Sequence, residues 1–406
     1  MKKGNLLSQD AEVLRMLGDT DAGIADQFRY LSEEEGFPVY SDSHITFFPD
    51  ALSEYREIMD AVKMAQDYIF MEYHAIEDRK AFRHLKQALA RKVSEGVEVR
   101  ILYDDMGSIG LLSRGFRRQM EAIGINCRVF NRISIILRKF MNNRDHRKMT
   151  IIDGRTAFTG GFNLVDECFN YKHPYGQWKD TGVRMTGNVV NSMTEMFLAM
   201  WDSPGEEKED FEPYFRRTEN RKEGEGFIQP FSDDPLDDSY VAENTYMNMI
   251  RNARRSLYLT TPYLIPTDEM QQALISAAER GVDVRIITPG IPDKKLVYRA
   301  TRANYADLLS SGIRIYEYSP GFLHAKQMIA DDEIAIVGTI NLDYRSMYYH
   351  FENAVLMYRA NAVRQIAHDF ADLFAVSREV KGAASEKNMC YGRMLDVFLR
   401  LASPLF

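Results

Sequence analysis

The chain has 406 residues, of which 45% are hydrophobic and 27% charged, as is typical of a folded globular protein with two or three domains. Its net charge of −8 argues against a dedicated nucleic-acid binder, and its three cysteines have no spacing that would indicate a disulfide scaffold or a zinc site. No apolar run approaches the length that spans a bilayer.

Residues 41–205 form the first predicted unit. We expect a buried strand at 68–73, a helix at about 81–95 and an alternating strand at 97–103. Gly96 precedes the second strand, as glycine commonly does at the end of a helix. A charged linker, predicted at 206–225, follows this unit.

A second unit, residues 226–380, repeats this order. It has a predicted strand at 257–262, a helix at 268–280 and, after a matching glycine, a strand at 282–287. Strands that alternate with helices predict an α/β fold, in which each unit has a mixed, mostly parallel sheet covered by helices. We expect the two units to pack as a pseudo-twofold pair.

One pattern, HxKx4Dx6GxxN, occurs in both units. Its members are His146, Lys148, Asp153, Gly160 and Asn163 in the first copy, and His324, Lys326, Asp331, Gly338 and Asn341 in the second. In both copies the asparagine follows the histidine by seventeen residues. The residues and the spacing of the whole motif are duplicated. Two histidines that merely pack in the core would not explain this duplication.

Each copy combines residue types that suit a phosphate group. Histidine is a nucleophile or acid near neutral pH, and a lysine two residues later on a strand points to the same side. The asparagines can donate to phosphoryl oxygens, and the glycines permit close backbone approach. Two facing copies would make one symmetric phosphate site without a metal. The nearest acidic pair, Asp104 and Asp105, is interpreted as turn carboxylates at a strand end.

The two motif aspartates, Asp153 and Asp331, lie an odd number of residues from the motif lysines. On a continuous strand they would point away from them, so we expect ion-pair or turn roles. Asp180 and Glu352, on the next predicted strands, are expected to orient the histidine of their own unit, with a surface or capping role as the alternative. Glu72 is a weaker candidate for such a role. The histidines outside the pattern are expected to be structural or solvated: His44, His74, His84, His173, His350 and His368.

In these residues the chain resembles the phospholipase D superfamily, whose mark is the duplicated HxKx4D motif. The flanking stretches narrow the resemblance to bacterial cardiolipin synthases, over about residues 20–406. These stretches are 143–148, 159–164, 261–266, 322–326 and 337–346.

The resemblance implies a phosphatidyltransferase with no cofactor and no metal. Its catalytic motif residues would be His146, Lys148, Asp153, His324, Lys326 and Asp331, and its phosphate-binding residues would be Lys148, Asn163, Lys326 and Asn341. It also implies that one histidine forms a phosphatidyl-histidine from phosphatidylglycerol while the other acts as acid and base. A second phosphatidylglycerol then accepts the group, which gives cardiolipin and glycerol. By resemblance to the family, the histidine of the first motif, His146, would be the nucleophile. The near symmetry of the two motifs leaves this assignment open.

Members of that family usually begin with transmembrane helices, and this chain shows none. We therefore expect a catalytic part of a longer protein, on the cytoplasmic side of a bacterial cell membrane, with residues 1–40 as a juxtamembrane segment. Candidates for contact with an anionic membrane surface are Arg132, Ile135, Ile136, Leu137, Arg138, Lys139 and Phe140. The alternative is a basic helix packed on the core. Residues 381–406 carry an amphipathic stripe that either packs on the domain or lies on the membrane.

Three other functions stay open. A hydrolytic phospholipase D would differ only in using water in place of a lipid hydroxyl. A phosphodiesterase acting on nucleic acid is disfavoured by the acidic net charge. A non-enzymatic lipid-binding scaffold is disfavoured by the complete motifs in both units. The oligomeric state is not determined by the sequence.

Overall fold

The computed structural model describes residues 7–132, 142–202, 209–216, 224 and 226–381. Arg132 is therefore described, whereas the other residues predicted to contact a membrane, Ile135, Ile136, Leu137, Arg138, Lys139 and Phe140, lie outside the described residues. The predicted C-terminal amphipathic segment also lies outside them, apart from its first residue. Within the described part of the chain, no helix combines the length and the apolar character needed to cross a membrane.

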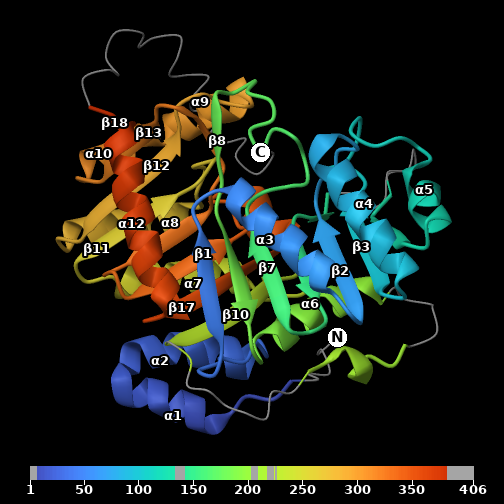
Figure 1. The fold of residues 1–406 in the computed structure, drawn as a ribbon. Coiled ribbons are helices and arrows are strands. Elements are labelled where there is room, and N and C mark those ends of the chain that lie inside the picture. Colours follow the sequence, from blue (N-terminus) through green and yellow to red (C-terminus); the bar gives the residue numbers. More distant parts are fainter. Residues whose placement is uncertain (1–6, 133–141, 203–208, 217–223, 225, 382–406) are drawn as a thin grey trace.

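A mixed sheet forms the centre of the first unit (Figure 1). In spatial order its strands are β1 (His44–Phe48), β9 (Gly182–Thr186), β7 (Thr156–Gly160), β6 (Lys148–Ile152), β2 (Tyr68–Tyr73), β3 (Glu98–Asp104) and β4 (Asn126–Phe130). The helices are α3 (Ala51–Met64), α4 (Lys80–Ser94), α5 (Phe116–Ala122) and α6 (Val190–Trp201), and two short strands are β5 (Arg144–Asp145) and β8 (Gln177–Lys179). The predicted strands and helix are confirmed, and Gly96 follows α4 with a φ of 92°.

The second unit repeats the strand order of this sheet and adds one further strand at its edge. Its order is β10 (Phe227–Asp233), β17 (His350–Tyr358), β16 (Ile334–Gly338), β15 (Gln327–Ala330), β11 (Ser256–Thr260), β12 (Asp283–Pro289), β13 (Arg314–Tyr318) and β18 (Ser377–Glu379). The other elements are α7 (Val241–Asn252), α8 (Asp268–Glu279), α9 (Lys295–Ala303), α10 (Tyr305–Ser310), β14 (Gly321–Leu323), α11 (Tyr344–Tyr348) and α12 (Asn361–Val376). The duplicated α/β architecture is therefore confirmed.

The share of parallel pairing is lower than predicted. In the first sheet β2–β3 and β3–β4 are parallel, whereas the other neighbouring pairs are antiparallel, and the second sheet follows the same scheme. The helical crossovers α4 and α5 produce the parallel pairs, since parallel strands need a long connection. After each motif the chain turns back at once, through Asp153–Arg155 in the first unit, and such a short turn gives an antiparallel hairpin.

The two units share a hydrophobic core between their sheets. α6 packs on β2, β6 and β7 of the first sheet and on β10 of the second, and α12 packs on β1 of the first sheet and on β13, β15 and β16 of the second. The buried side chains of this shared core include Phe70, Ile151 and Val183 from the first unit and Val337 and Met357 from the second. The units therefore form one body in which a site can lie between them.

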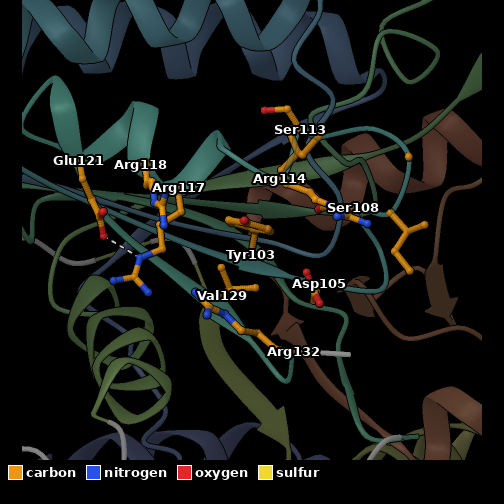
Figure 2. Close-up of a pocket in the computed structure, with 13 residues that line it drawn as sticks. Tyr103, Asp105, Ser108, Ser113, Arg114, Arg117, Arg118, Glu121, Val129 and Arg132 are labelled. Atoms are coloured by element: carbon orange, nitrogen blue, oxygen red, sulfur yellow. Dashed lines mark hydrogen bonds and ion pairs between the residues drawn. The ribbon is translucent and has the colours of Figure 1, made fainter. Parts of the chain in front are cut away.

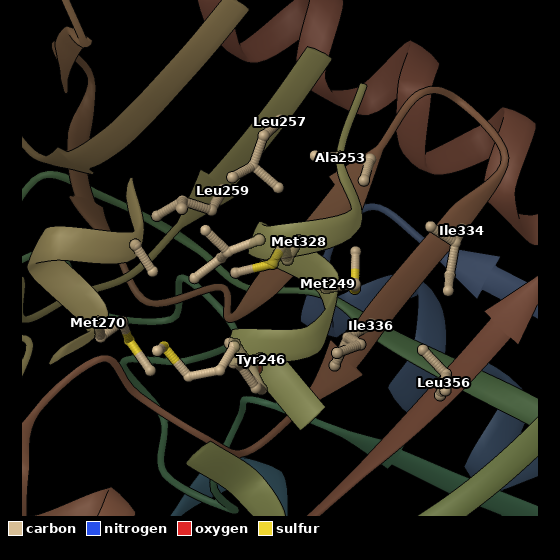
Figure 3. Close-up of a cluster of buried hydrophobic side chains, with 14 of the residues drawn as sticks. Tyr246, Met249, Ala253, Leu257, Leu259, Met270, Met328, Ile334, Ile336 and Leu356 are labelled. Atoms are coloured by element: carbon tan, nitrogen blue, oxygen red, sulfur yellow. The ribbon is translucent and has the colours of Figure 1, made fainter. Parts of the chain in front are cut away.

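Both faces of the central strands are buried, as the continuous apolar runs predict. Leu257 and Leu259 of β11 and Ile334 and Ile336 of β16 pack with α7 and α8 (Figure 3). The intervening Ala335 and the following Val337 belong to the core shared with the first unit, as expected from the two-residue repeat of a strand.

The N-terminal helices pack on the second unit. α1 (Ala11–Thr20), α2 (Ala22–Arg29) and the π-helical turn η1 (Tyr30–Glu34) precede the first sheet, and Phe28 and Leu31 join the core that contains Tyr246. Gln229 donates a hydrogen bond to the Phe28 carbonyl at 3.0 Å. A juxtamembrane role for residues 1–40 stays a prediction. In the predicted linker, the 3-10 turn η2 (Glu212–Tyr214) packs on the first sheet through contact of the Tyr214 and Phe70 rings.

Candidate active site

Each motif lies where the parallel strands of its sheet end. Lys148, the first residue of β6, pairs with Tyr73, the last residue of β2. In the second unit Gln327 pairs with Thr260 at the end of β11. This edge, outside the carboxyl ends of parallel strands, is the usual place for a ligand site in an α/β sheet.

Short strands exchanged between the units position the two histidines. β5, directly before His146, pairs with the start of β17, and the His146 amide donates to the Phe351 carbonyl at 2.9 Å. β14, directly before His324, pairs with β8, and the His324 amide donates to the Lys179 carbonyl at 2.7 Å. Each histidine is therefore held by the backbone of the opposite unit.

The orienting carboxylates follow the same crossed arrangement. Glu352 of the second unit accepts a hydrogen bond from Nδ1 of His146 at 2.8 Å, and Asp180 of the first unit accepts one from Nδ1 of His324 at 2.8 Å. The prediction that each carboxylate orients the histidine of its own unit is wrong, because the exchanged strands place each carboxylate beside the opposite histidine. Both contacts leave Nε2 free for chemistry.

The two carboxylates have different surroundings. Asp180 also accepts from Nε1 of Trp178 at 3.2 Å. Although burial acts against ionisation, contact with His324 and the other donors holds the pKa of Asp180 below its usual value. Glu352 accepts from the Thr339 hydroxyl, and burial raises its pKa well above the usual value. Asp180 is therefore better suited than Glu352 to stabilise a charged imidazolium.

Two buried lysines, Lys148 and Lys326, lie beside the two motif histidines and affect their pKa values. Each donates from Nζ to the carbonyl of the histidine in its own motif. Burial lowers the pKa of Lys148 to about 7 and the pKa of Lys326 to about 8. Burial also lowers the pKa of His324 to about 4 and that of His146 well below its usual value, and both lysines act in the same direction. Burial therefore disfavours positive charge on all four side chains in the free site, and a bound anion would stabilise their protonated forms.

The motif asparagines have amide groups available to a substrate. Asn163 accepts from the Ala75 amide at 3.1 Å through Oδ1, which leaves its Nδ2 as a donor. Asn341 is 4% exposed, and its Oδ1 has no partner among the described residues. Phosphoryl oxygens accept hydrogen bonds, so the group of each asparagine that suits a phosphate is its Nδ2 donor and not its Oδ1.

The motif aspartates lie away from this centre, at the other end of the motif strands. Asp153 accepts from the backbone amides of Gln66, Asp67 and Tyr68 at 2.7–2.9 Å and has a φ of 55°. Asp331 accepts in the same way from the amides of residues 254–256 at 2.6–3.0 Å. They tie the turn after the motif strand to the start of the neighbouring strand, and so they are the turn residues of the motif.

Two further carboxylates hold the segment around His146. Asp104 accepts from Nε of Arg144 at 2.9 Å, and Glu72 accepts from Nε of Arg147 at 2.7 Å. Asp104 is therefore a strand-end carboxylate, as expected, and Glu72 supports the backbone of the motif through Arg147.

Two histidines that the sequence interpretation set aside lie beside His146. The ring centroids of His74 and His350 are 5.0 and 5.3 Å from that of His146. His350 lies two residues before Glu352 on β17, a spacing that places both on one face of the strand and could have indicated its position. No spacing in the sequence indicates His74. The remaining histidines outside the motifs are exposed: His44, His84, His173 and His368.

Among the described residues, His146, His350 and Glu352 have possible ligand atoms within 4.8 Å of one another. One of these atoms, Nδ1 of His146, already bonds to Glu352. We therefore interpret the group as a hydrogen-bonded pair with a neighbouring ring, and the metal independence of the site stays a prediction.

The motif glycines allow the strands that carry the carboxylates to approach. A Cβ atom at Gly160 would lie 2.5 Å from the Thr181 carbonyl, and one at Gly338 would lie 2.4 Å from the Asn353 carbonyl. Thr181 and Asn353 directly follow the two orienting carboxylates. The close backbone approach expected from the sequence is therefore present in both units.

This arrangement can hold a phosphodiester between two Nε2 atoms, with its oxygens near lysine and asparagine donors. One ring can attack phosphorus while the other gives a proton to the leaving oxygen. The fold and the site define an enzyme of the phospholipase D type.

Comparison with known proteins identifies the family. Residues 58–201 and 246–374 match the family described as "Cardiolipin synthase, PLD-like domain", and the chain belongs to this family. It is 35% identical over 352 residues to cardiolipin synthase 2 of Bacillus cereus, covering 86% of this chain and 68% of that one. It is 32% identical over 369 residues to the cardiolipin synthase of Alkalihalophilus pseudofirmus, covering 91% and 73%. The chain is therefore a phosphatidyltransferase enzyme of the phospholipase D type.

Two other similarities extend over most of the chain. An uncharacterized protein of Streptococcus mutans is 41% identical over 396 residues, covering 98% of this chain and 86% of that protein. The crystal structure of a phosphatidylserine synthase of Haemophilus influenzae Rd KW20 superposes with a TM-score of 0.69 at 14% identity, covering 91% of this chain and 95% of that one. The second similarity shows a shared fold.

Proposed function

We propose that the protein is a cardiolipin synthase that transfers a phosphatidyl group between two phosphatidylglycerol molecules, with His146 as the nucleophile and His324 as acid and base. The observation that carries the proposal is the pair of crossed, unequal histidine–carboxylate contacts. The name cardiolipin synthase, which the Bacillus cereus and Alkalihalophilus relatives carry, supports cardiolipin as the product.

In the first step, Nε2 of His146 attacks the phosphorus of one phosphatidylglycerol. The bond between phosphorus and the glycerol oxygen breaks, and Nε2 of His324 gives its proton to that oxygen, so that glycerol leaves. Asp180, which accepts from His324 and Trp178, stabilises the charged ring before it gives up the proton. Lys148 and Lys326 compensate the negative charge on the phosphoryl oxygens.

In the second step, a hydroxyl of another phosphatidylglycerol gives its proton to His324 and attacks the phosphorus. The bond between phosphorus and His146 breaks, which releases cardiolipin and restores the free ring. Water in place of the lipid hydroxyl would give phosphatidic acid. Both substrates are lipids, so we propose that the protein works at the surface of a bacterial membrane, with the cytoplasmic side as the expected side.

The test uses purified protein, phosphatidylglycerol vesicles and EDTA, with products resolved by mass spectrometry. We expect cardiolipin and free glycerol in equal amounts from the unaltered protein, and none from His146→Gln or His324→Gln. Arg56→Gln, an exposed change on α3, is the matched control and should retain activity.

Denaturant quenching at neutral pH, which preserves the acid-labile bond between phosphorus and nitrogen, followed by peptide mass spectrometry identifies the nucleophile. We expect a phosphatidyl adduct on the peptide that contains His146, with none in His146→Gln. An adduct on His324 would reverse the two roles. Phosphatidic acid without cardiolipin would contradict the transferase proposal in favour of hydrolysis, and activity abolished by EDTA would contradict the metal-free reaction.

A further inference from the structure

A large cavity lies in the first unit beside the catalytic centre. Its volume is about 1070 Å³. This volume is just above the upper end of the range of roughly 300–1000 Å³ that is usual for sites that bind small organic ligands. Its lining includes Tyr103, Ser108, Arg114, Arg117, Arg118 and Arg132. In Figure 2, Arg114, Arg117 and Arg118 lie on one side of Tyr103 and Arg132 on the other. The cavity therefore presents arginines from α5, from the loop before it and from the segment after β4.

The lining has four arginines, Arg114, Arg117, Arg118 and Arg132, against two carboxylates, Asp105 and Glu121, so its formal charge is positive. Arg117 forms an ion pair with Glu121 at 2.6 Å. For Arg114, Arg118 and Arg132 no ion pair is found with any residue that the structure describes. Guanidinium groups favour phosphate because their planar donors match two of its oxygens. A phosphodiester anion is therefore the kind of group that complements this cavity.

The cavity and the catalytic centre share a wall. Ser108 lines the cavity, and a Cβ atom on the preceding residue, Gly107, would lie 2.7 Å from the imidazole of His74. The ring of His74 in turn lies 5.0 Å from that of His146. β2 and β3 are parallel, with Tyr73 opposite Tyr103, so the loop that carries Ser108 leaves the sheet at the same edge as the HxK motif.

Exposed apolar side chains follow β3 in the first unit and β12 in the second, in loops and at the start of α9. In the loop after β3, Met106 is 39% and Ile109 62% exposed, and in the region after β12, Ile291 is 40% and Leu296 53% exposed. Exposed apolar side chains can enter the headgroup region of a bilayer, and cations beside them are attracted to anionic lipids.

We propose that this arginine-lined cavity binds the phosphate headgroup of an anionic phospholipid in the membrane and so holds the catalytic edge against the bilayer. The inference rests on the proposed function, because that function makes anionic phospholipids the substrates. It adds a second lipid site, separate from the one between the two histidines. The occupant is a membrane lipid; free phosphate is the alternative that the test separates.

The experiment measures vesicle binding in a His146→Gln background, so that turnover does not alter the lipids. The probes are phosphatidylcholine vesicles with and without phosphatidylglycerol, followed by co-sedimentation. We expect Arg114→Glu with Arg118→Glu to weaken binding to the phosphatidylglycerol vesicles by about tenfold or more, since each basic side chain near an anionic surface contributes about 1 kcal/mol. Arg56→Glu, a charge reversal outside the cavity, should leave binding unchanged.

Calorimetry with inorganic phosphate and with glycerol 3-phosphate separates the two sources of the anion. Tight binding of the small anions that the arginine changes abolish, with vesicle binding unaltered, would overturn the lipid assignment. Equal vesicle binding by the double variant and its control would overturn the site altogether. Cardiolipin formation is measured separately, so failure of the proposed function and failure of this second site give different results.

Discussion

Asp180 and His324 lie 144 positions apart in the chain and in different units, yet they share a buried hydrogen bond of 2.8 Å. Glu352 and His146, 206 positions apart, repeat the relationship in the opposite direction. The catalytic pairs are therefore properties of the boundary between the units, and changes at that boundary should affect both histidines.

The crossed arrangement of carboxylates and histidines predicts which histidine ring each carboxylate orients. Asp180→Asn should lower the rate of cardiolipin formation by about 10²- to 10⁴-fold, because an amide does not stabilise the imidazolium. In ¹H–¹⁵N spectra of the histidine rings, the Nδ1 proton of His324 should shift while that of His146 stays. Glu352→Gln is the matched variant and should shift only His146. A shift of the ring within the same unit would contradict the crossed arrangement.

The motif glycines should not tolerate a methyl group. Gly160→Ala and Gly338→Ala would each place a Cβ atom within 2.5 Å of a backbone carbonyl. We expect a loss of about 1–3 kcal/mol in the free energy of unfolding from overpacking, together with lower activity as the neighbouring carboxylate moves. Urea denaturation measures the first effect. Gly18→Ala, on α1 with nothing within 4 Å of the added atom, is the control and should be neutral or stabilising.

Anion binding should weaken as the pH rises through the lysine pKa values. Lys148, with a pKa of about 7, and Lys326, with a pKa of about 8, must be protonated to bind an anion. Above these values binding takes up protons, so the affinity for sulfate, whose charge is constant in this range, should fall by up to about tenfold per pH unit for each lysine. Calorimetry between pH 6 and about 10 measures this dependence. Lys148→Met should remove part of the slope, and an unchanged slope would contradict the assignment.

A hydrogen bond across the boundary should contribute to stability. Nδ2 of Asn353 donates to the Thr159 hydroxyl at 2.8 Å, and both side chains are buried. Asn353→Ala should cost about 1–3 kcal/mol in the free energy of unfolding, because it leaves a buried group without its partner. In a double-mutant cycle with Thr159→Val, we expect a coupling of about 0.5–1.5 kcal/mol. Strictly additive effects would show that this contact does not join the units.

Local patterns account for what could be predicted from the sequence. The apolar run of β2, the amphipathic α4 and the glycine after it depend on neighbours a few residues apart, so periodicity indicates them. The spacing of the HxK motifs likewise indicates their chemistry. The pairing of carboxylate and histidine depends instead on how β5 and β14 cross between units, which no local pattern contains. The position of His74 likewise follows from sheet register, which brings it beside His146, and no local pattern indicates it.

The presence of both copies in one chain frees them from having to be identical. Trp178 and Phe322 surround the ring of His324, at centroid distances of 5.0 and 5.8 Å, whereas two imidazoles surround the ring of His146. A twofold dimer of a single repeat would impose the same surroundings on both rings. Fusion of the copies breaks that constraint, so that one imidazole can be tuned for bonding to phosphorus and the other for carrying a proton.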